Sequence, residues 1–413
     1  MDQPVANHEG ESMTNTSTNV SRPWSVFLIF LRLGLTSFGG PIAHLGYFRA
    51  EFVTRRRWLS ERSYADLVAL CQFLPGPASS QVGIAVGLSR AGYSGALAAW
   101  AGFTLPSAVA LILFALGISS YGDYVSQGAL HGLKVVAVAV VAQAVWGMAR
   151  NLCTDGLRVT IMAVATCVVL LVPSAWGQVG VIAIAGIAGR LLFKPAQIIE
   201  HDPLPITVSH RAGVLWLSLF FVLLIGLPVL AKLMPSQTMA MVDSFYRVGS
   251  LVFGGGHVVL PLLQAEVVPS GWVSNGSFLA GYGAAQAVPG PLFTFAAFLG
   301  ASMNTAPSGW IGGIVCLLAI FAPSFLLVVG AMPFWERLRR NTGTQAALAG
   351  INASVVGLLL AALYHPVWTS AIFQPQDFGL ALVALVALMF WKLPPWLVVV
   401  GSGAAGWLLS IAL

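Results

Sequence analysis

The stretch FLRLGLTSFGG at residues 30–40 decides the fold, because it returns at residues 245–255 as FYRVGSLVFGG. Six of the eleven positions are identical, among them Arg32 with Arg247. The offset of 215 residues also relates Glu51 to Glu266. It is 214 for QFLPGP at 72–77, which returns as QAVPGP at 286–291. Chance similarity between apolar segments would not keep charges and a Pro-Gly-Pro in register, so the chain contains two copies of one unit.

The composition indicates that both copies lie in a membrane. Of the 413 residues, 57% are hydrophobic and only 8% are charged, whereas soluble proteins carry about 25% charged residues. This scarcity excludes a soluble enzyme, a disordered chain and a nucleic-acid binder, despite the net charge of +6. The fold class predicted is an all-α polytopic membrane protein. Apolar segments near or at spanning length run at 95–118, 132–149, 158–172, 176–193, 213–231, 308–331, 346–364, 377–391 and 395–413.

The repeat divides the chain into four parts. We expect a disordered tail at 1–22, a first transporter repeat at 23–193, a linker with one extra span at 194–244, and a second repeat at 245–413. Each copy holds two broken apolar stretches and then four spans, so an odd number of crossings separates equivalent points. The copies are therefore predicted to be inverted, and the arginine-rich loops of the first copy to be cytoplasmic. Inverted repeats with discontinuous or re-entrant helices are typical of secondary transporters.

The breaks are the candidate substrate site. A helix break within a membrane is costly unless it lines a cavity or is buried in protein. The free amides and the dipole at a helix start favour anions. A purely structural kink is the alternative interpretation. The residues predicted to form a shared site are Phe38, Gly39, Gly40, Gln72, Pro75, Gly76, Pro77, Phe253, Gly254, Gly255, Gln286, Pro289, Gly290 and Pro291.

Arg32 and Arg247 are added to this site because a charge inside a membrane is costly and needs a partner or a role. Two guanidinium forks would fit a tetrahedral dianion. The alternative is a structural ion pair with Glu51, Glu266 or Asp66. Residues considered for proton coupling are Glu51, Asp66, His257 and Glu266. The scattered histidines and cysteines predict no metal site and no cofactor.

The motifs resemble those of the chromate ion transporter family, in its long-chain, two-domain form (ChrA type). The resemblance rests on RLGLTSFGGP at 32–41, QFLPGP at 72–77, and GGGH at 254–257 with Pro261 and Glu266. The second copy departs from the pattern, because Gly256 replaces the equivalent of Pro41.

The resemblance implies efflux of chromate across the bacterial inner membrane and chromate resistance. A membrane-embedded enzyme, such as a chromate reductase, would need cofactor ligands or a redox pair, which the cysteines and histidines do not supply, so no enzymatic activity is expected. Alternating access driven by the membrane potential, with proton antiport as a possible addition, is the expected mechanism. A carrier of sulfate or another oxyanion and a passive anion channel stay open as alternatives. The expected partners are chromate, with sulfate as a possible competitor, and the lipid bilayer; a homodimer is left open and no nucleic acid is expected.

Overall fold

The computed structural model describes residues 22–121, 126–193 and 208–412, and in these ranges every regular element is a helix. The predicted tail lies outside this part except for Arg22, and so do residues 194–207 of the predicted linker. Within these described ranges, six helices are long and apolar enough to cross a membrane. The protein is thus an all-α polytopic membrane protein, as predicted.

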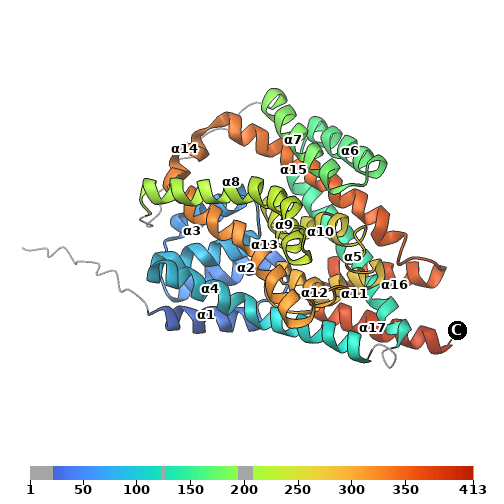
Figure 1. Cartoon of the computed structure of the whole chain (residues 1–413). Helices are drawn as coiled ribbons and strands as arrows, with labels where there is room; N and C mark the ends of the chain where they lie inside the picture. Colours follow the sequence, from blue (N-terminus) through green and yellow to red (C-terminus); the bar gives the residue numbers. More distant parts are fainter. Residues whose placement is uncertain (1–21, 122–125, 194–207, 413) are drawn as a thin grey trace, which may run out of the picture.

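The helices follow one another in the same order in both halves of the chain (Figure 1). Those of the first half are α1 (Pro23–Thr36), α2 (Gly40–Arg49), α3 (Glu61–Phe73), α4 (Ala78–Tyr121), α5 (Gln127–Leu152), α6 (Gly156–Leu171) and α7 (Ala175–Leu192). Those that follow are α8 (His210–Leu233), α9 (Gln237–Leu251), α10 (Val259–Val267), α11 (Asn275–Ala287), α12 (Phe295–Ala301), α13 (Gly309–Ala331), α14 (Trp335–Arg340), α15 (Thr342–Ala362), α16 (Pro375–Met389) and α17 (Pro395–Ala412).

All four predicted breaks are confirmed. The Phe-Gly-Gly motifs separate α1 from α2 and α9 from a short 3-10 turn that leads into α10. The Pro-Gly-Pro motifs separate α3 from α4 and α11 from the turn before α12. The long α4 also bends at Ala91 and Gly92, whose backbone angles are not helical. Its two parts thereby correspond to α12 and α13 of the second copy.

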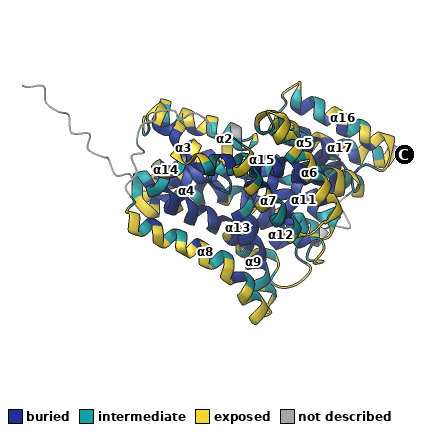
Figure 2. Ribbon diagram, turned by 90° about the horizontal axis from the view of Figure 1, so that it is seen from above, coloured by how far each residue is buried: buried dark blue, intermediate teal, exposed yellow. Residues whose placement is uncertain are grey.

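The later helices of the two copies are interleaved. Helix α5 packs against α17, and α15 packs against α7, so each pair takes one helix from each copy. We call α5, α6, α7, α15, α16 and α17 the six-helix group. It lies on one side of the molecule in Figure 1, with α1, α2, α3 and the first part of α4 on the other, and the second part of α4 runs along the bottom toward α17. Helix α13 is largely buried and packs against α9, α12, α8 and α4, whereas α8 is exposed along much of its length, as Figure 2 shows.

Small residues bring the interleaved helices together. A side-chain carbon at Gly132 on α5 would lie 2.1 Å from the backbone oxygen of Ser402 on α17. A side-chain carbon at Gly350 on α15 would lie 2.1 Å from the backbone oxygen of Ala185 on α7. Close backbone approach through small residues is the usual way in which membrane helices associate. Since Gly132 and Gly350 are equivalent in the repeat, the two contacts are copies of each other.

Candidate functional site

The four breaks are joined in crossed pairs by backbone hydrogen bonds. The N–H of Gly76 donates to the carbonyl of Val252 at 2.7 Å, and the N–H of Gly290 donates to the carbonyl of Ser37 at 3.0 Å. Each Pro-Gly-Pro loop therefore binds the residue just before the Phe-Gly-Gly motif of the other copy. The two bonds are equivalent in the repeat, because both donors and both acceptors occupy matching positions.

Glycine is required at the centre of each Pro-Gly-Pro loop for two reasons. The φ angles of Gly76 and Gly290 are +123° and +101°, a region that residues with a side chain rarely adopt. A side-chain carbon at Gly76 would also lie 2.6 Å from Oγ of Ser324, and one at Gly290 would lie 2.9 Å from Oγ of Ser107. These serines again belong to the opposite copy and are equivalent to each other.

The crossed pairing leaves a cavity of about 90 Å³ between the breaks. Three of the four breaks contribute to it, together with the middle of α5 and the corner between α16 and α17. Its lining residues are Gly39, Gly40, Pro41, Val140, Gln143, His257, Ala285, Gln286, Val288, Gly290, Leu292, Leu388 and Pro395. A water molecule takes up about 30 Å³ in the liquid, so the space suits a small inorganic ion rather than an organic ligand.

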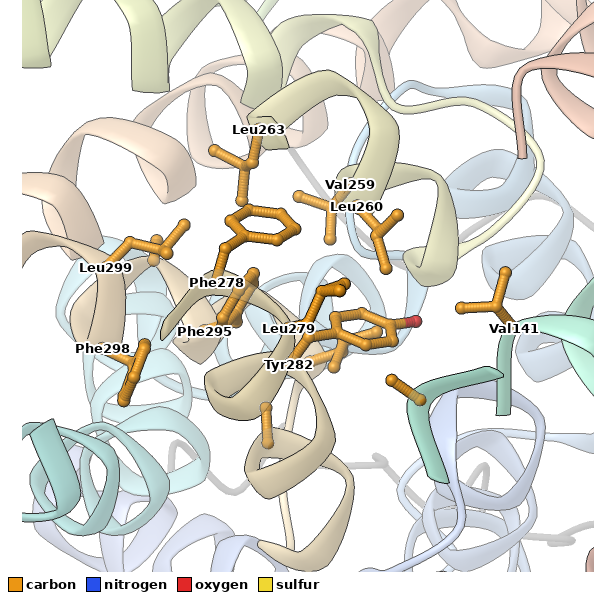
Figure 3. Packing of buried hydrophobic residues seen from close by; sticks show 14 of the residues in the cluster. Val141, Val259, Leu260, Leu263, Phe278, Leu279, Tyr282, Phe295, Phe298 and Leu299 are labelled. Atoms are coloured by element: carbon orange, nitrogen blue, oxygen red, sulfur yellow. The ribbon is translucent and has the colours of Figure 1, made fainter. Parts of the chain in front are cut away.

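The cavity offers neutral hydrogen-bonding groups. The amide nitrogen of Gln286 is buried and has no hydrogen-bond partner among the described residues. The Nδ1 atom of His257 lies 2.9 Å from the hydroxyl of Tyr282. Figure 3 shows Tyr282 packed with Phe278, Leu279 and Phe295, its hydroxyl pointing out of this cluster on the side of Val141. A buried donor without a partner costs about 1–3 kcal/mol, which a bound acceptor would offset.

Backbone amides add to these donors. Helix α2 starts at Gly40, directly beside the cavity, with Pro41 in its first turn. The first amides of a helix have no partner within the helix and carry the positive end of its dipole. No Asp, Glu, Lys or Arg lines the cavity. Such a site can hold an anion through hydrogen bonds and helix dipoles without any ion pair.

Arg247 lies outside the cavity and is occupied by carboxylates. Its guanidinium donates to Glu266 and, at 2.9 Å, to Asp243, and its side chain is only 9% exposed. Ser244 donates a further hydrogen bond of 2.8 Å to Glu266. The guanidinium also lies over the ring of Trp176, 4.9 Å from its centroid. In this conformation Arg247 has the structural ion pair that was the alternative to anion binding.

Arg32 has a different environment from its counterpart. It is exposed on α1, and no described residue lies within ion-pair distance of its guanidinium. Glu51, which is equivalent to Glu266, instead accepts from Arg56 at 2.7 Å and from Arg55 at 3.0 Å. Partial burial raises the pKa of Glu51, but the hydrogen bonds and charges of Arg56 and Arg55 outweigh it and lower this pKa overall.

The structure thus brings together only part of the predicted set. The predicted residues that line the cavity are Gly39, Gly40, His257, Gln286 and Gly290. Gln72 is exposed on α3, and Asp66 is buried on the same helix away from the cavity. The remaining glycines and prolines shape the breaks without lining the space. Across the described residues no three His, Cys, Asp or Glu side chains gather as a metal site would require.

Gln143 is a lining residue that the sequence argument missed. It lies on α5, which belongs to the first copy but contains no break. The signal was present, because Gln143 is a polar residue in the middle of the apolar segment 132–149. Polar residues at such depth usually face the interior of a helix bundle or a cavity.

Comparisons with known proteins show to which family the sequence is related. The family model described as chromate transporter matches residues 24–190 and 239–407. The chromate transport protein of Pseudomonas aeruginosa is 29% identical, with 98% of each chain covered. The probable chromate transport protein of Synechococcus elongatus is 26% identical, covering 91% of this chain and 93% of its own. The chromate transport protein of Cupriavidus metallidurans is 24% identical, covering 92% and 91% respectively.

No solved structure shows a significant match to this chain. The family assignment therefore rests on sequence, and the model match extends over both halves of the chain. Together with the spanning helices and the glycine-rich breaks that the family motifs form, the matches lead to one conclusion: the chain belongs to the chromate transporter family.

Proposed function

We propose that this protein is a secondary transporter that exports chromate from the cytoplasm across the bacterial inner membrane and thereby confers chromate resistance. The observation that carries the proposal is the small cavity at which breaks from both copies meet in a chain of this family. An inside-negative potential drives a dianion outward by about 2.3 kcal/mol per charge for each 100 mV. Export therefore has a driving force without a nucleotide-binding motif, and proton antiport would add to it.

The proposed substrate site is the cavity itself. Chromate is a tetrahedral dianion, and its oxygens would accept hydrogen bonds from Gln286, Gln143 and the first amides of α2. We assign Gly39, Gly40 and Gly290 the role of letting the backbone approach the anion. Arg32 and Arg247 do not touch the cavity in this conformation.

The proposed mechanism is alternating access by two inverted copies. Equivalent residues touch each other only near a two-fold axis, and a side-chain carbon at Gly256 would lie 3.4 Å from Cγ of its equivalent Pro41. The crossed bonds of Gly76 and Gly290 are also what such an axis would produce. The axis would therefore pass beside the cavity, as it does in transporters built from inverted repeats.

The test is uptake of chromate into everted membrane vesicles, with and without a pH gradient and with sulfate as competitor. Saturable uptake that depends on the membrane potential is expected. The variant Gln286→Leu should reduce uptake by about ten- to a hundredfold, since hydrogen bonds to charged groups contribute about 1.5–3 kcal/mol. Non-saturating flux would instead identify a channel, and unchanged uptake in Gln286→Leu would refute the assigned site.

A further inference from the structure

The two copies differ in how their broken helices are packed. Helix α11 packs closely against α5 and α17, whereas its equivalent α3 has no comparable packing against α15 and α7. Leu279 on α11 is fully buried, and a side-chain carbon at Gly283 would lie 2.4 Å from the backbone oxygen of Leu133. The equivalent positions on α3 are Ala65 and Ala69, and both are exposed. One side of the cavity is thus sealed and the other is not.

Arg247 joins several helices on the side of the molecule where α11 is packed. Its ion pair with Glu266 ties α9 to the end of α10, and its ion pair with Asp243 lies within α9. Its contact with Trp176 reaches the start of α7, which belongs to the six-helix group. A single guanidinium therefore connects the broken helices of the second copy to the six-helix group. We call Arg247, Glu266 and Trp176 the outer latch, because the loops near them contain no Lys or Arg.

The same three residue types recur on the open side. Arg32 and Glu51 are equivalent to Arg247 and Glu266, and Trp396 follows a proline at the start of α17 as Trp176 does before α7. These residues, the inner latch, are apart: Arg32 has no partner among the described residues, and Glu51 is held by Arg55 and Arg56. Pro395, the neighbour of Trp396, is part of the cavity lining, so the inner latch adjoins the cavity.

The backbone around Glu51 shows how the inner latch is kept apart. Residues Ala50–Arg55 form a π-helical turn, whereas α10 continues as a regular α-helix through Glu266. A π-turn adds one residue to the turn and changes the direction of the side chains that follow. Aromatic contacts of Phe30 with Phe48 and Phe52 still hold α1 against this segment. Glu51 therefore occupies the position that matches Glu266, but its carboxylate is bound by Arg55 and Arg56 and not by Arg32.

We propose that the outer and inner latches close alternately, so that Arg247, Glu266 and Trp176 seal the cavity from outside in this cytoplasm-facing state. In the opposite state α3 would dock on α15 and α7, Arg32 would pair with Glu51 over Trp396, and the outer latch would separate. This inference rests on the proposed alternating access. It assigns the two arginines to gating rather than to the anion, with Asp243 as a positioning residue for Arg247.

The test measures which side is open, by cysteine labelling in lipid nanodiscs without chromate. Cys71, Cys153, Cys167 and Cys316 are first replaced by serine, and one reporter is added, either Ala65→Cys or Leu279→Cys. A soluble maleimide should react about tenfold faster at residue 65 than at residue 279, because the protein rests in the cytoplasm-facing state. Equal rates at the two reporters would overturn the inference.

The latch variants then test direction. Trp176→Ala should raise the labelling rate at residue 279 and lower the rate at residue 65. The ratio of the rate at 279 to the rate at 65 should increase by about threefold to tenfold. The matched variant Trp396→Ala should leave residue 65 the faster site, because its latch is already open. The inference would be overturned if both variants changed the ratio of labelling rates in the same direction, or if Trp176→Ala left this ratio unchanged.

Two further arrangements keep the result clear. If Trp176→Ala does not elute as a folded protein on size exclusion, Glu266→Gln replaces it, with Glu51→Gln as its match. Because labelling uses no chromate, the expected ratios in a protein that fails to transport chromate would support the latches and refute the proposed function. Chromate transport without the expected labelling ratios would support the proposed function and refute the latches.

Discussion

Gln143 is the residue whose role depends most on the fold. It lies in the middle of α5 and contributes a side-chain amide to the cavity, although α5 itself is an unbroken helix. Its repeat equivalent is Ala361, so the two copies cannot supply the same donor. The cavity proposed as the substrate site is therefore asymmetric, even though the breaks that surround it are paired.

We expect Gln143→Leu to lower the affinity for chromate by about tenfold, since one hydrogen bond to a charged group is worth about 1.5–3 kcal/mol. The measurement is the concentration dependence of uptake into everted vesicles. The control is Gln127→Leu on the same helix, an exposed residue that does not line the cavity and should leave the affinity unchanged. An equal effect of both variants would contradict the assignment.

Glu51 gives a prediction on pH. Its pKa lies below the ordinary value of 4.5, because hydrogen bonds and charges of Arg56 and Arg55 outweigh the effect of partial burial. A carboxyl with a lowered pKa in the folded state stabilises the fold above its ordinary pKa, and this contribution is lost as the pH falls through the lower folded value. Glu51 is therefore ionised throughout the neutral range, and in this conformation it does not take up a proton there.

Glu51→Gln should consequently leave the shape of the pH dependence of chromate uptake unchanged between about pH 6 and pH 8, where histidine is the ordinary titrating group. Its measurable effect should be lower thermal stability near neutral pH, and this difference from the unmodified protein should disappear in acid. Loss of the pH dependence of uptake in this variant would instead identify Glu51 as a coupling group.

At the level of elements, glycine contacts between interleaved helices hold the six-helix group together. Gly132 on α5 lies against α17, whereas Gly147 on the same helix has no neighbour within 4 Å of an added side-chain carbon. The two glycines thus differ in surroundings but share one helix. They form a matched pair for testing whether close approach, rather than helix flexibility, is what the sequence requires.

Gly132→Ala should destabilise the detergent-solubilised protein by about 1–3 kcal/mol, because the backbone of α17 must move to admit the methyl group. Gly147→Ala should be neutral or stabilising by up to about 1 kcal/mol, since alanine is the better helix former. Thermal unfolding followed by tryptophan fluorescence measures both. A Gly132→Ala protein as stable as Gly147→Ala would mean that α5 and α17 do not pack as closely as described.

For the whole molecule, the interleaving predicts that neither copy is complete by itself. Helices α5 and α7 of the first copy find their main partners, α17 and α15, in the second. A chain cut between residues 193 and 208 should therefore give two pieces that are degraded when expressed singly but associate when expressed together. Co-purification through a tag on one piece, together with chromate uptake, measures this. Either piece accumulating stably alone would contradict the interleaved packing.

Much of the fold could be predicted from particular residues. The Phe-Gly-Gly and Pro-Gly-Pro motifs located all four breaks, because each contains a glycine whose positive φ turns the chain out of the helix. The partners of the arginines could not be predicted. Arg32 and Arg247 occur in matching sequences, yet one is exposed and the other lies between two carboxylates, one of which, Asp243, is matched by Leu28 in the first copy.

The sequence by itself determined the membrane class, the positions of the breaks, the repeat and the family, because composition and local motifs are sufficient for each. Only the tertiary structure decided that each Pro-Gly-Pro loop binds the opposite Phe-Gly-Gly motif, that Gln143 joins the cavity, and that α11 is packed while α3 is exposed. The physical reason is that a repeated sequence is nearly symmetric, whereas its two copies are packed differently in this structure. That difference depends on contacts between distant residues, and no local pattern contains them.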